Sequence, residues 1–201
     1  MNMPRQQAVF ASHNQHKLKE VREVLSSFLD ICSLDDLGLK EEAEETAETF
    51  EGNAIIKAQD IASRCSMAVI SDDSGLSINA LGGFPGVRSA RFMEGSSYKD
   101  KCEALIGMLK DKEDRAASFN TALCYIPADR SKTLVFLGQD PGRIIEEYPE
   151  GEQNGFGYDP VFYSFALGKT YGNASDEEKN SVSHRGRALR KFLQYLEESQ
   201  K

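Results

Sequence analysis

Residues 68–76 read AVISDDSGL, an apolar run followed by two aspartates between serines and then a glycine. Met67 to Ile70 has the composition of a short buried strand, and Asp, Ser and Gly commonly end strands and build turns. The sequence therefore predicts a strand that ends in a turn at Asp72 and Asp73. Polar groups just beyond a strand end in an open α/β sheet are also well placed to bind a ligand. Taken alone, the stretch favours a turn without function.

A strand, a polar loop and a helix are predicted before this stretch. Residues 6–12 (QQAVFAS) read as a strand. Residues 13–30 then carry apolar side chains at helical spacing, namely Leu18, Val21, Leu25, Phe28 and Leu29. A second helix is predicted over 49–65, with an apolar face of Ala54, Ile55, Ala58, Ile61 and Ala62.

The remainder of the chain alternates between segments with the periodicity of strands and segments with the periodicity of helices. Strands are predicted at LSINAL (76–81), ASFNTALCYI (117–126), KTLVFLG (132–138), GRIIEEY (142–148) and at the end of EGEQNGFGYDPVFY (150–163). Helices are predicted over 99–110 and 175–198, the second opening on a Ser175–Glu178 capping box. The glycines and proline of GGFPGVRSARF (82–92) exclude regular structure there. The fold class is therefore α/β, a mixed sheet flanked by helices, in a single domain over 1–201.

Composition narrows the class of protein. The chain has 201 residues and a formal net charge of −8, which argues against a broad nucleic-acid surface, since that would need a basic face. The sequence contains no apolar run long enough to cross a membrane and no secretory signal pattern, so we expect no membrane association and a cytoplasmic protein. Cysteines 32, 65, 102 and 124 form no C-x-x-C pair and suggest neither zinc nor a disulfide framework.

Residues 12–17 (SHNQHK) lead from the first strand into a helix. Free N–H groups and partial positive charge at a helix N-terminus suit phosphate, and Ser12, Asn14 and Lys17 would add donors and a full charge. An ordinary helix cap with a solvated lysine is the simpler interpretation of this segment alone. It is not a Walker A loop, because the glycines are missing.

An acidic run precedes the second helix, at Glu41, Glu42, Glu44, Glu45, Glu48 and Glu51. Most such runs are solvated surface near a helix N-terminus. One glutamate that reached Asp72 or Asp73 would instead complete an oxygen site for Mg²⁺, and composition does not distinguish the glutamates. Asn53 and Lys57 lie four residues apart and share a helix face, so Lys57 can either reach a phosphate or extend to solvent.

Two later segments combine glycines, aromatic rings and donors. NGFGYDPVF (154–162) allows close backbone approach to a ligand and offers rings that can stack on a base, although an aromatic core plug is the structural alternative. EEKNSVSHRGRAL (177–189) places Lys179, His184, Arg185 and Arg187 on or near one helix. His184 beside Arg185 makes a donor pair that suits an acceptor-rich edge.

These segments, in this order, resemble the inosine triphosphate pyrophosphatase family, the noncanonical purine NTP pyrophosphatases, over almost the whole chain. The most specific motifs are SDDSGLSINALGGFPGVRSARF (71–92), GFGYDPVF (155–162) and SHRGRAL (183–189), supported by FASHNQHKLKEVREVL (10–25) and FEGNAIIKA (50–58). The resemblance implies Mg²⁺-dependent hydrolysis of ITP, dITP and XTP to the monophosphate and pyrophosphate, which removes deaminated purines before they enter DNA or RNA. It also implies a homodimer, and a mixed twisted sheet in two lobes with a central cleft.

Carried over position by position, the resemblance implies roles for individual residues. The substrate phosphates would contact the loop Ser12, His13, Asn14, Gln15, His16 and Lys17, together with Lys57 and Ser74. The metal ligands would be Glu44 and Asp73, and Asp73 would also be the proton acceptor. The base pocket would be Phe156, Gly157, Tyr158, Asp159, Lys179, His184 and Arg185, with Arg88 and Arg91 in the matching glycine-rich loop.

Departures and alternatives accompany the resemblance. His13 stands where many members have glycine, Ser12 where many have threonine, and His16 where a smaller residue precedes the lysine. Asp72 is left as a structural neighbour or an indirect partner of Asp73. A Maf-like pyrophosphatase acting on modified pyrimidines or dTTP is the alternative enzyme, and a nucleotide-binding sensor without catalysis is the alternative outside enzymes.

Overall fold

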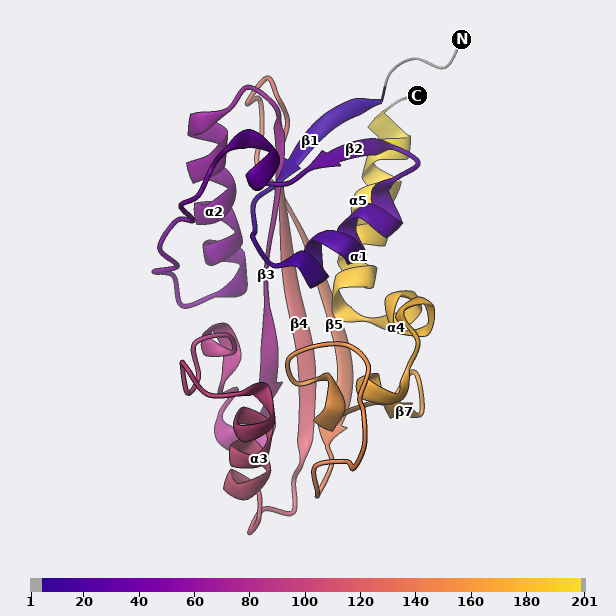
Figure 1. Cartoon of the computed structure of the whole chain (residues 1–201). Helices are drawn as coiled ribbons and strands as arrows, with labels where there is room; N and C mark the ends of the chain where they lie inside the picture. Colours follow the sequence, from indigo (N-terminus) through magenta and orange to yellow (C-terminus); the bar gives the residue numbers. More distant parts are fainter. Residues whose placement is uncertain (1–4, 200–201) are drawn as a thin grey trace. The chain divides into compact units, whose positions relative to one another are not determined.

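The computed structural model describes residues 5–199, and within them seven strands form one sheet in the order β2-β1-β3-β4-β5-β6-β7 (Figure 1). The strands are β1 (Gln6–Phe10), β2 (Leu29–Cys32), β3 (Ala68–Ile78), β4 (Ala116–Ile126), β5 (Leu134–Ile144), β6 (Phe162–Ser164) and β7 (Lys169–Thr170). β1 pairs in parallel with β2 and β3, whereas β5, β6 and β7 pair antiparallel, so the predicted mixed α/β sheet is confirmed.

Five α-helices accompany the sheet in the described residues: α1 (Gln15–Leu25), α2 (Phe50–Arg64), α3 (Tyr98–Met108), α4 (Asp176–Val182) and α5 (His184–Ser199). The predicted helices over 49–65 and 99–110 are confirmed by α2 and α3. The Ser175–Glu178 capping box is present at the start of α4. Of these helices, none combines the length and apolar composition that crossing a bilayer requires.

The predicted turn at Asp72 and Asp73 is wrong, because β3 runs without interruption from Ala68 to Ile78. Residues 76–78 of the expected second strand are the end of this same strand, and its other residues, Asn79–Leu81, form a 3₁₀ helix. Burial outweighs the turn propensity of these residues, because every residue from Ala68 to Asp73 is buried. The polar side chains among them form hydrogen bonds with the helices that cover the strand. The two carboxylates therefore lie within a strand.

Three other boundaries differ from the prediction. Leu29 leaves the predicted helix and begins β2, an added strand that pairs with β1. The separate strands predicted at 132–138 and 142–148 form the single strand β5. The helix predicted over 175–198 breaks at Ser183, whose extended backbone (φ −61°, ψ 157°) ends α4 before α5 begins.

The chain divides into two compact units. Unit 1 comprises the described residues within 1–73, 121–137 and 185–201, and unit 2 comprises residues 74–120 and 138–184. β3, β4 and β5 each contribute residues to both units. Each unit has a hydrophobic core of its own. The candidate residues up to Asp73, together with Arg185, lie in unit 1, whereas Ser74, the aromatic loop, Lys179 and His184 lie in unit 2.

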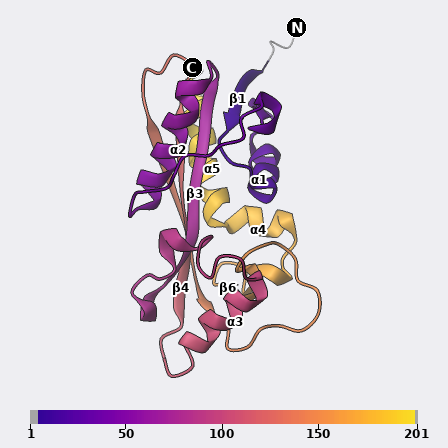
Figure 2. The same ribbon diagram turned by 60° about the vertical axis from the view of Figure 1, so that its left-hand side comes forward.

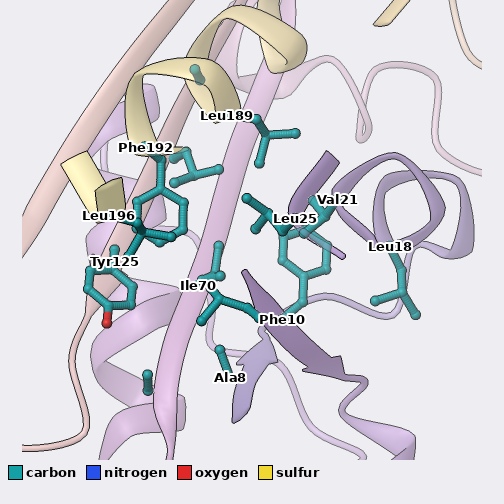
Figure 3. Packing of buried hydrophobic residues seen from close by; sticks show 14 residues of the cluster. Ala8, Phe10, Leu18, Val21, Leu25, Ile70, Tyr125, Leu189, Phe192 and Leu196 are labelled. Atoms are coloured by element: carbon teal, nitrogen blue, oxygen red, sulfur yellow. The ribbon is translucent and has the colours of Figure 1, made fainter. Parts of the chain in front are cut away.

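In unit 1, helices cover both faces of the strands (Figures 1 and 2). α1 and α5 pack on the face that carries Phe10 and Ile70, with Leu25 and Phe192 in the same cluster (Figure 3). α2 packs on the opposite face, where Val69 meets the apolar side of that helix. Because side chains alternate along a strand, neighbouring residues of β3 address different helices.

In unit 2, α3 and the distal half of β3 share a core. Leu76 and Ile78 of β3 pack with Leu105 of α3 and with the aromatic rings of Phe119 and Phe162. The predicted irregular loop at 82–92 is confirmed at Gly82 and Gly83, which have positive φ, but wrong at Gly86–Arg88, which forms a short 3₁₀ helix. This core supports the aromatic loop that follows β5.

Candidate active site

Asp72 and Asp73 are adjacent in β3 and point to opposite faces of the sheet in unit 1. Asp72 shares the face of Ile70 and contacts α1 and α5, whereas Asp73 shares the face of Ser71 and contacts α2. Strand geometry gives this alternation directly. The two carboxylates therefore belong to different clusters of charges. Figure 2 shows α1 and α2, the helices that contribute to these clusters, on either side of β3.

On the α2 face, two side chains contact Asp73, and a third contacts the lysine beside it. Lys57 Nζ lies 3.4 Å from Asp73 Oδ1 and 2.6 Å from Glu45 Oε1. Asn53 Nδ2 donates to Asp73 Oδ2 at 3.2 Å. The residues Asn53 and Lys57 come from one face of α2, and Glu45 comes from the acidic segment that precedes the helix. Lys57 therefore lies between two carboxylates, one on each side of its ammonium group.

Burial dominates the electrostatics of this cluster. Desolvation raises the pKa of Asp73 above its ordinary value, and the Lys57 ammonium only partly offsets it. Desolvation also acts to lower the pKa of Lys57, but the attraction of Asp73, Asp72 and Glu45 outweighs it and leaves that pKa raised. Asp73 is thus a carboxylate with a raised proton affinity beside a lysine that stays charged.

On the opposite face, Asp72 holds two cations. Lys17 Nζ of α1 lies 3.1 Å from Asp72 Oδ1, and Arg185 Nε of α5 donates to Asp72 Oδ2 at 2.9 Å. Arg185 also donates through Nη1 to Glu20. Arg185 is only 1% exposed and Asp72 is fully buried. The cluster is a buried network of two carboxylates and two cations between α1, β3 and α5.

This network keeps Asp72 ionised. Burial acts to raise the pKa of Asp72, but Lys17 and Arg185 outweigh it and hold the pKa well below the ordinary range. For Lys17, burial is the largest influence and lowers the pKa despite the neighbouring Asp72. Asp72 and Asp73 thus differ in proton affinity because their neighbours differ.

The loop before α1 has the cap geometry that its sequence predicts. Asn14 is the N-cap, and its side chain accepts from the backbone N–H groups of His16 and Lys17. Ser12 Oγ accepts from the N–H of Asn14 at 3.2 Å. The backbone N–H of His13 donates to Glu42 Oε1 at 2.6 Å, so a carboxylate already contacts this loop. Gln15 is exposed and donates to the carbonyl of His13.

In unit 2, the predicted base-pocket residues form a buried aromatic and charged set. Lys179 Nζ lies 2.7 Å from Asp159 Oδ2 and 4.7 Å from the centre of the Phe156 ring. His184 stacks on Phe119 with ring centres 4.7 Å apart. A cation against an aromatic face and a carboxylate is a strong, oriented donor.

Gly155 permits the tight backbone conformation of the loop that carries Phe156. Its φ is +76°, and a Cβ there would lie 2.2 Å from Asp159 Oδ2. That same oxygen accepts from the backbone N–H of Phe156 at 2.8 Å. Asp159 therefore fixes both the loop backbone and the Lys179 ammonium, and the close approach requires glycine at 155.

Other predicted residues have different surroundings. Tyr158 is buried, donates to the carbonyl of Ser89 at 2.7 Å and packs edge-on against Tyr98, so its hydroxyl serves the core of unit 2. Ser74 is half-buried in β3, and both loop arginines, Arg88 and Arg91, are exposed. Gly157 has positive φ in the aromatic loop.

Two neighbouring glutamates of the acidic segment have different surroundings. Glu44 is exposed, whereas Glu45 contacts Lys57 beside Asp73. Sequence reasoning also assigned no role to Glu20 and Asn53. The spacing of both residues could have indicated their positions. Glu20 is three residues after Lys17, and Asn53 is four residues before Lys57 on a buried helix face, so each shares a helix face with that lysine.

The sequence matches the model of the Ham1 family over residues 8–195. The chain belongs to the Ham1 family. A dITP/XTP pyrophosphatase of Bacillus subtilis (strain 168) is 45% identical over 196 residues, covering 95% of this chain and 97% of that protein. A dITP/XTP pyrophosphatase of Thermoanaerobacter sp. (strain X514) is 41% identical over 192 residues, covering 94% and 95%. The resemblance stated from the motifs is confirmed.

Solved structures of Ham1 proteins share this fold. The Coxiella burnetii HAM1 protein matches with a TM-score of 0.87 and 35% identity, covering 96% of this chain and 99% of that one. The Staphylococcus aureus Ham1 protein matches with a TM-score of 0.85 and 36% identity, covering 98% and 100%. The mixed sheet and its helices are therefore those of Ham1 structures.

Proposed function

We propose that this Ham1-family protein hydrolyses noncanonical purine nucleoside triphosphates, dITP, XTP and ITP, to the monophosphate and pyrophosphate. Relatives named dITP/XTP pyrophosphatases cover nearly its whole length. The observation that carries the proposal is the buried pair Asp72 and Asp73, each held beside a lysine and each with a different proton affinity. Paired carboxylates with separated pKa values are typical of acid–base chemistry.

The phosphate-binding role falls to residues of unit 1. Lys57 is a buried cation, the Lys17 side chain is only 14% exposed, and the capped N-terminus of α1 adds backbone donors at residues 12–17. Holding the triphosphate against these groups would align the attacking water with the α-phosphorus. The new bond joins the water oxygen to that phosphorus, and the bond to the bridging oxygen breaks as pyrophosphate leaves.

Two carboxylates fit a magnesium ion. Glu45 and Asp73 each direct an oxygen at Lys57 Nζ, so they already converge on one positive charge. Magnesium typically takes one or two protein carboxylates, with water and substrate phosphate oxygens as its other ligands. We therefore propose Glu45, in place of the predicted Glu44, together with Asp73 as the metal ligands. A bound Mg²⁺ would neutralise charge on the phosphate oxygens.

Asp73 is the proposed proton acceptor. Its raised pKa gives the carboxylate a higher proton affinity than an exposed aspartate, which suits accepting a proton from water. Asn53 and Lys57 orient the two oxygens of the carboxylate. A positioned general base of this kind contributes about 10²–10⁴-fold to a rate.

Recognition of the purine is assigned to the aromatic set of unit 2. Phe156 offers a ring for stacking and Lys179 supplies a donor beside it, while His184, stacked on Phe119, supplies another donor in unit 2. A 6-oxo group accepts a hydrogen bond, whereas the 6-amino group of adenine donates one, so a donor-rich pocket rejects adenine. Arg185 remains a predicted reader of the 6-oxo group, although two of its nitrogens donate to Asp72 and Glu20.

A panel of nucleotides tests the activity. Purified protein with Mg²⁺ should release pyrophosphate from ITP, dITP and XTP far faster than from ATP, GTP, CTP or dTTP, and Asp73→Asn should reduce that rate by about 10²–10⁴-fold. Equal rates on ATP and ITP would contradict the proposed selectivity for noncanonical purines. A preference for dTTP or modified pyrimidines would instead favour a Maf-like enzyme, and tight ITP binding without turnover would favour a sensor. A homodimer is proposed from the resemblance, and light scattering tests it; the cytoplasmic location stays an expectation from the sequence.

A further inference from the structure

The structure assigns Asn53 as the positioning residue that orients Glu45 and Asp73 together, an inference that rests on the proposed metal-dependent function. Asn53 is fully buried on α2, one helical turn before Lys57. It contacts both the strand that carries Asp73 and the segment that carries Glu45. Lys57 contacts the same two segments, but through a charged ammonium group.

The two ends of the Asn53 amide have fixed directions. Its Oδ1 accepts from the backbone N–H of Ala47 at 2.9 Å, and its Nδ2 donates to Asp73 Oδ2 at 3.2 Å. A backbone N–H can only donate, so the oxygen must face Ala47 and the NH₂ group must face the carboxylate. The amide orientation follows from its partners.

Each contact constrains one proposed metal ligand. The bond to Ala47 anchors the acidic segment two residues after Glu45, which lies 2.6 Å from Lys57 Nζ. The bond to Asp73 occupies Oδ2 and leaves Oδ1 directed at the same ammonium group, 3.4 Å away. Asn53 thus sets the separation and direction of two carboxylates that come from segments distant in sequence.

Partners of this kind tune metal sites without touching the metal. Hydrogen bonds that orient ligating carboxylates typically change metal affinity or activity by about 10–100-fold when removed. Leucine has nearly the shape of asparagine but neither donates nor accepts. We expect Asn53→Leu to weaken metal binding and to lower kcat by about 10–100-fold, with KM for ITP changed by less than about threefold.

Ser71→Ala is the matched control. Ser71 is fully buried on the same face of β3, and its hydroxyl donates to the carbonyl of Ala54 on α2 at 2.6 Å. The substitution removes a buried hydrogen bond between the same helix and strand without touching either carboxylate. Both variants should lower Tm, whereas only Asn53→Leu should change kcat and metal affinity.

The decisive measurement is binding of Mn²⁺ alone, followed by the electron paramagnetic resonance signal of the free ion, on full-length wild type, Asn53→Leu, Asn53→Ala, Ser71→Ala and Asp73→Asn. Weaker binding in both Asn53 variants and wild-type binding in Ser71→Ala support the inference. Wild-type Mn²⁺ affinity and kcat per folded molecule in both Asn53 variants would overturn it.

The same panel separates this inference from the proposed function. If wild-type protein binds Mn²⁺ but hydrolyses no ITP, the proposed function fails, and the Mn²⁺ comparison still decides the role of Asn53. If wild-type protein binds no Mn²⁺, or Asp73→Asn binds it as tightly as wild type, the metal assignment and the inference both fail.

Discussion

Asp72 and Asp73 have the same side chain and adjacent positions, and their surroundings give them different chemistry. Asp73 faces one lysine and an amide, and burial raises its pKa. Asp72 faces Lys17 and Arg185, which hold its pKa low. The difference arises from strand alternation, because each residue addresses another helix. A one-residue shift in register would exchange the two roles.

Arg185→Ala should destabilise the protein. The substitution leaves Asp72 and Glu20 near each other without the guanidinium that both contact, and breaking a buried ion pair costs about 3–5 kcal/mol. Urea denaturation followed by circular dichroism measures the loss. Arg187→Ala, a change of the same charge two residues along α5, is the control and should cost much less. Unchanged stability in Arg185→Ala, with ITP selectivity lost, would show that Arg185 serves the substrate alone.

At the scale of elements, α2 both builds the core and contacts Asp73. Its apolar residues build the core with Val69, and Asn53 and Lys57 reach Asp73 from the same buried side. Arg130 anchors the end of the helix, because it donates to the carbonyls of Ala62 in the last turn, of the C-cap Cys65 and of Met67 just beyond. A helix whose last carbonyls are held in this way is fixed at both ends, because Thr49 caps its start.

Arg130→Ala should lower the stability of unit 1. Charged hydrogen bonds to carbonyls contribute about 1.5–3 kcal/mol each, partly compensated by solvent at this half-buried position, so we expect a loss of about 2 kcal/mol in the free energy of unfolding. Thermal and urea denaturation measure it. Arg130→Lys keeps the charge but loses the forked guanidinium that donates to several carbonyls. It should recover less than half of the free energy of unfolding that Arg130→Ala loses. Full recovery by lysine would reduce the role of Arg130 to its charge.

At the scale of the whole molecule, two units each carry a core and a polar set. Unit 1 holds the carboxylates and the buried cations, and unit 2 holds the aromatic loop with Lys179 and Asp159. The central strands contribute to both units, so the chain crosses between them several times. Each unit also contains one fully buried cysteine, Cys124 in unit 1 and Cys102 in unit 2.

These two thiols should report on the opening of each unit. Burial raises the pKa of both Cys102 and Cys124 to about 12, so at pH 8 each stays protonated as well as inaccessible. Iodoacetamide should therefore leave both unlabelled in the native protein and label both in urea, as read by mass spectrometry. Because the reactive thiolate becomes more populated as pH rises, labelling of any opened state should accelerate with pH. Rapid native labelling of either cysteine would show that its unit opens readily.

The sequence by itself determined what depends on neighbours along the chain. The apolar periodicity of α1, α2 and α3, a cap within residues 12–17, the capping box at Ser175 and the irregular backbone at Gly82 and Gly83 were all predictable, because each reflects contacts within a few residues. The motifs also identified the family, since their order and spacing are specific.

Only the tertiary structure decided the rest. The continuity of β3 through Asp72 and Asp73, and the contact of Glu45 with Lys57, depend on helices that supply partners and exclude water. Arg185 lies 113 residues from the Asp72 that it contacts, a distance that no local pattern spans. Local propensity favoured a turn at this point, and burial between two helices made it a strand with a different cluster of charges on each face.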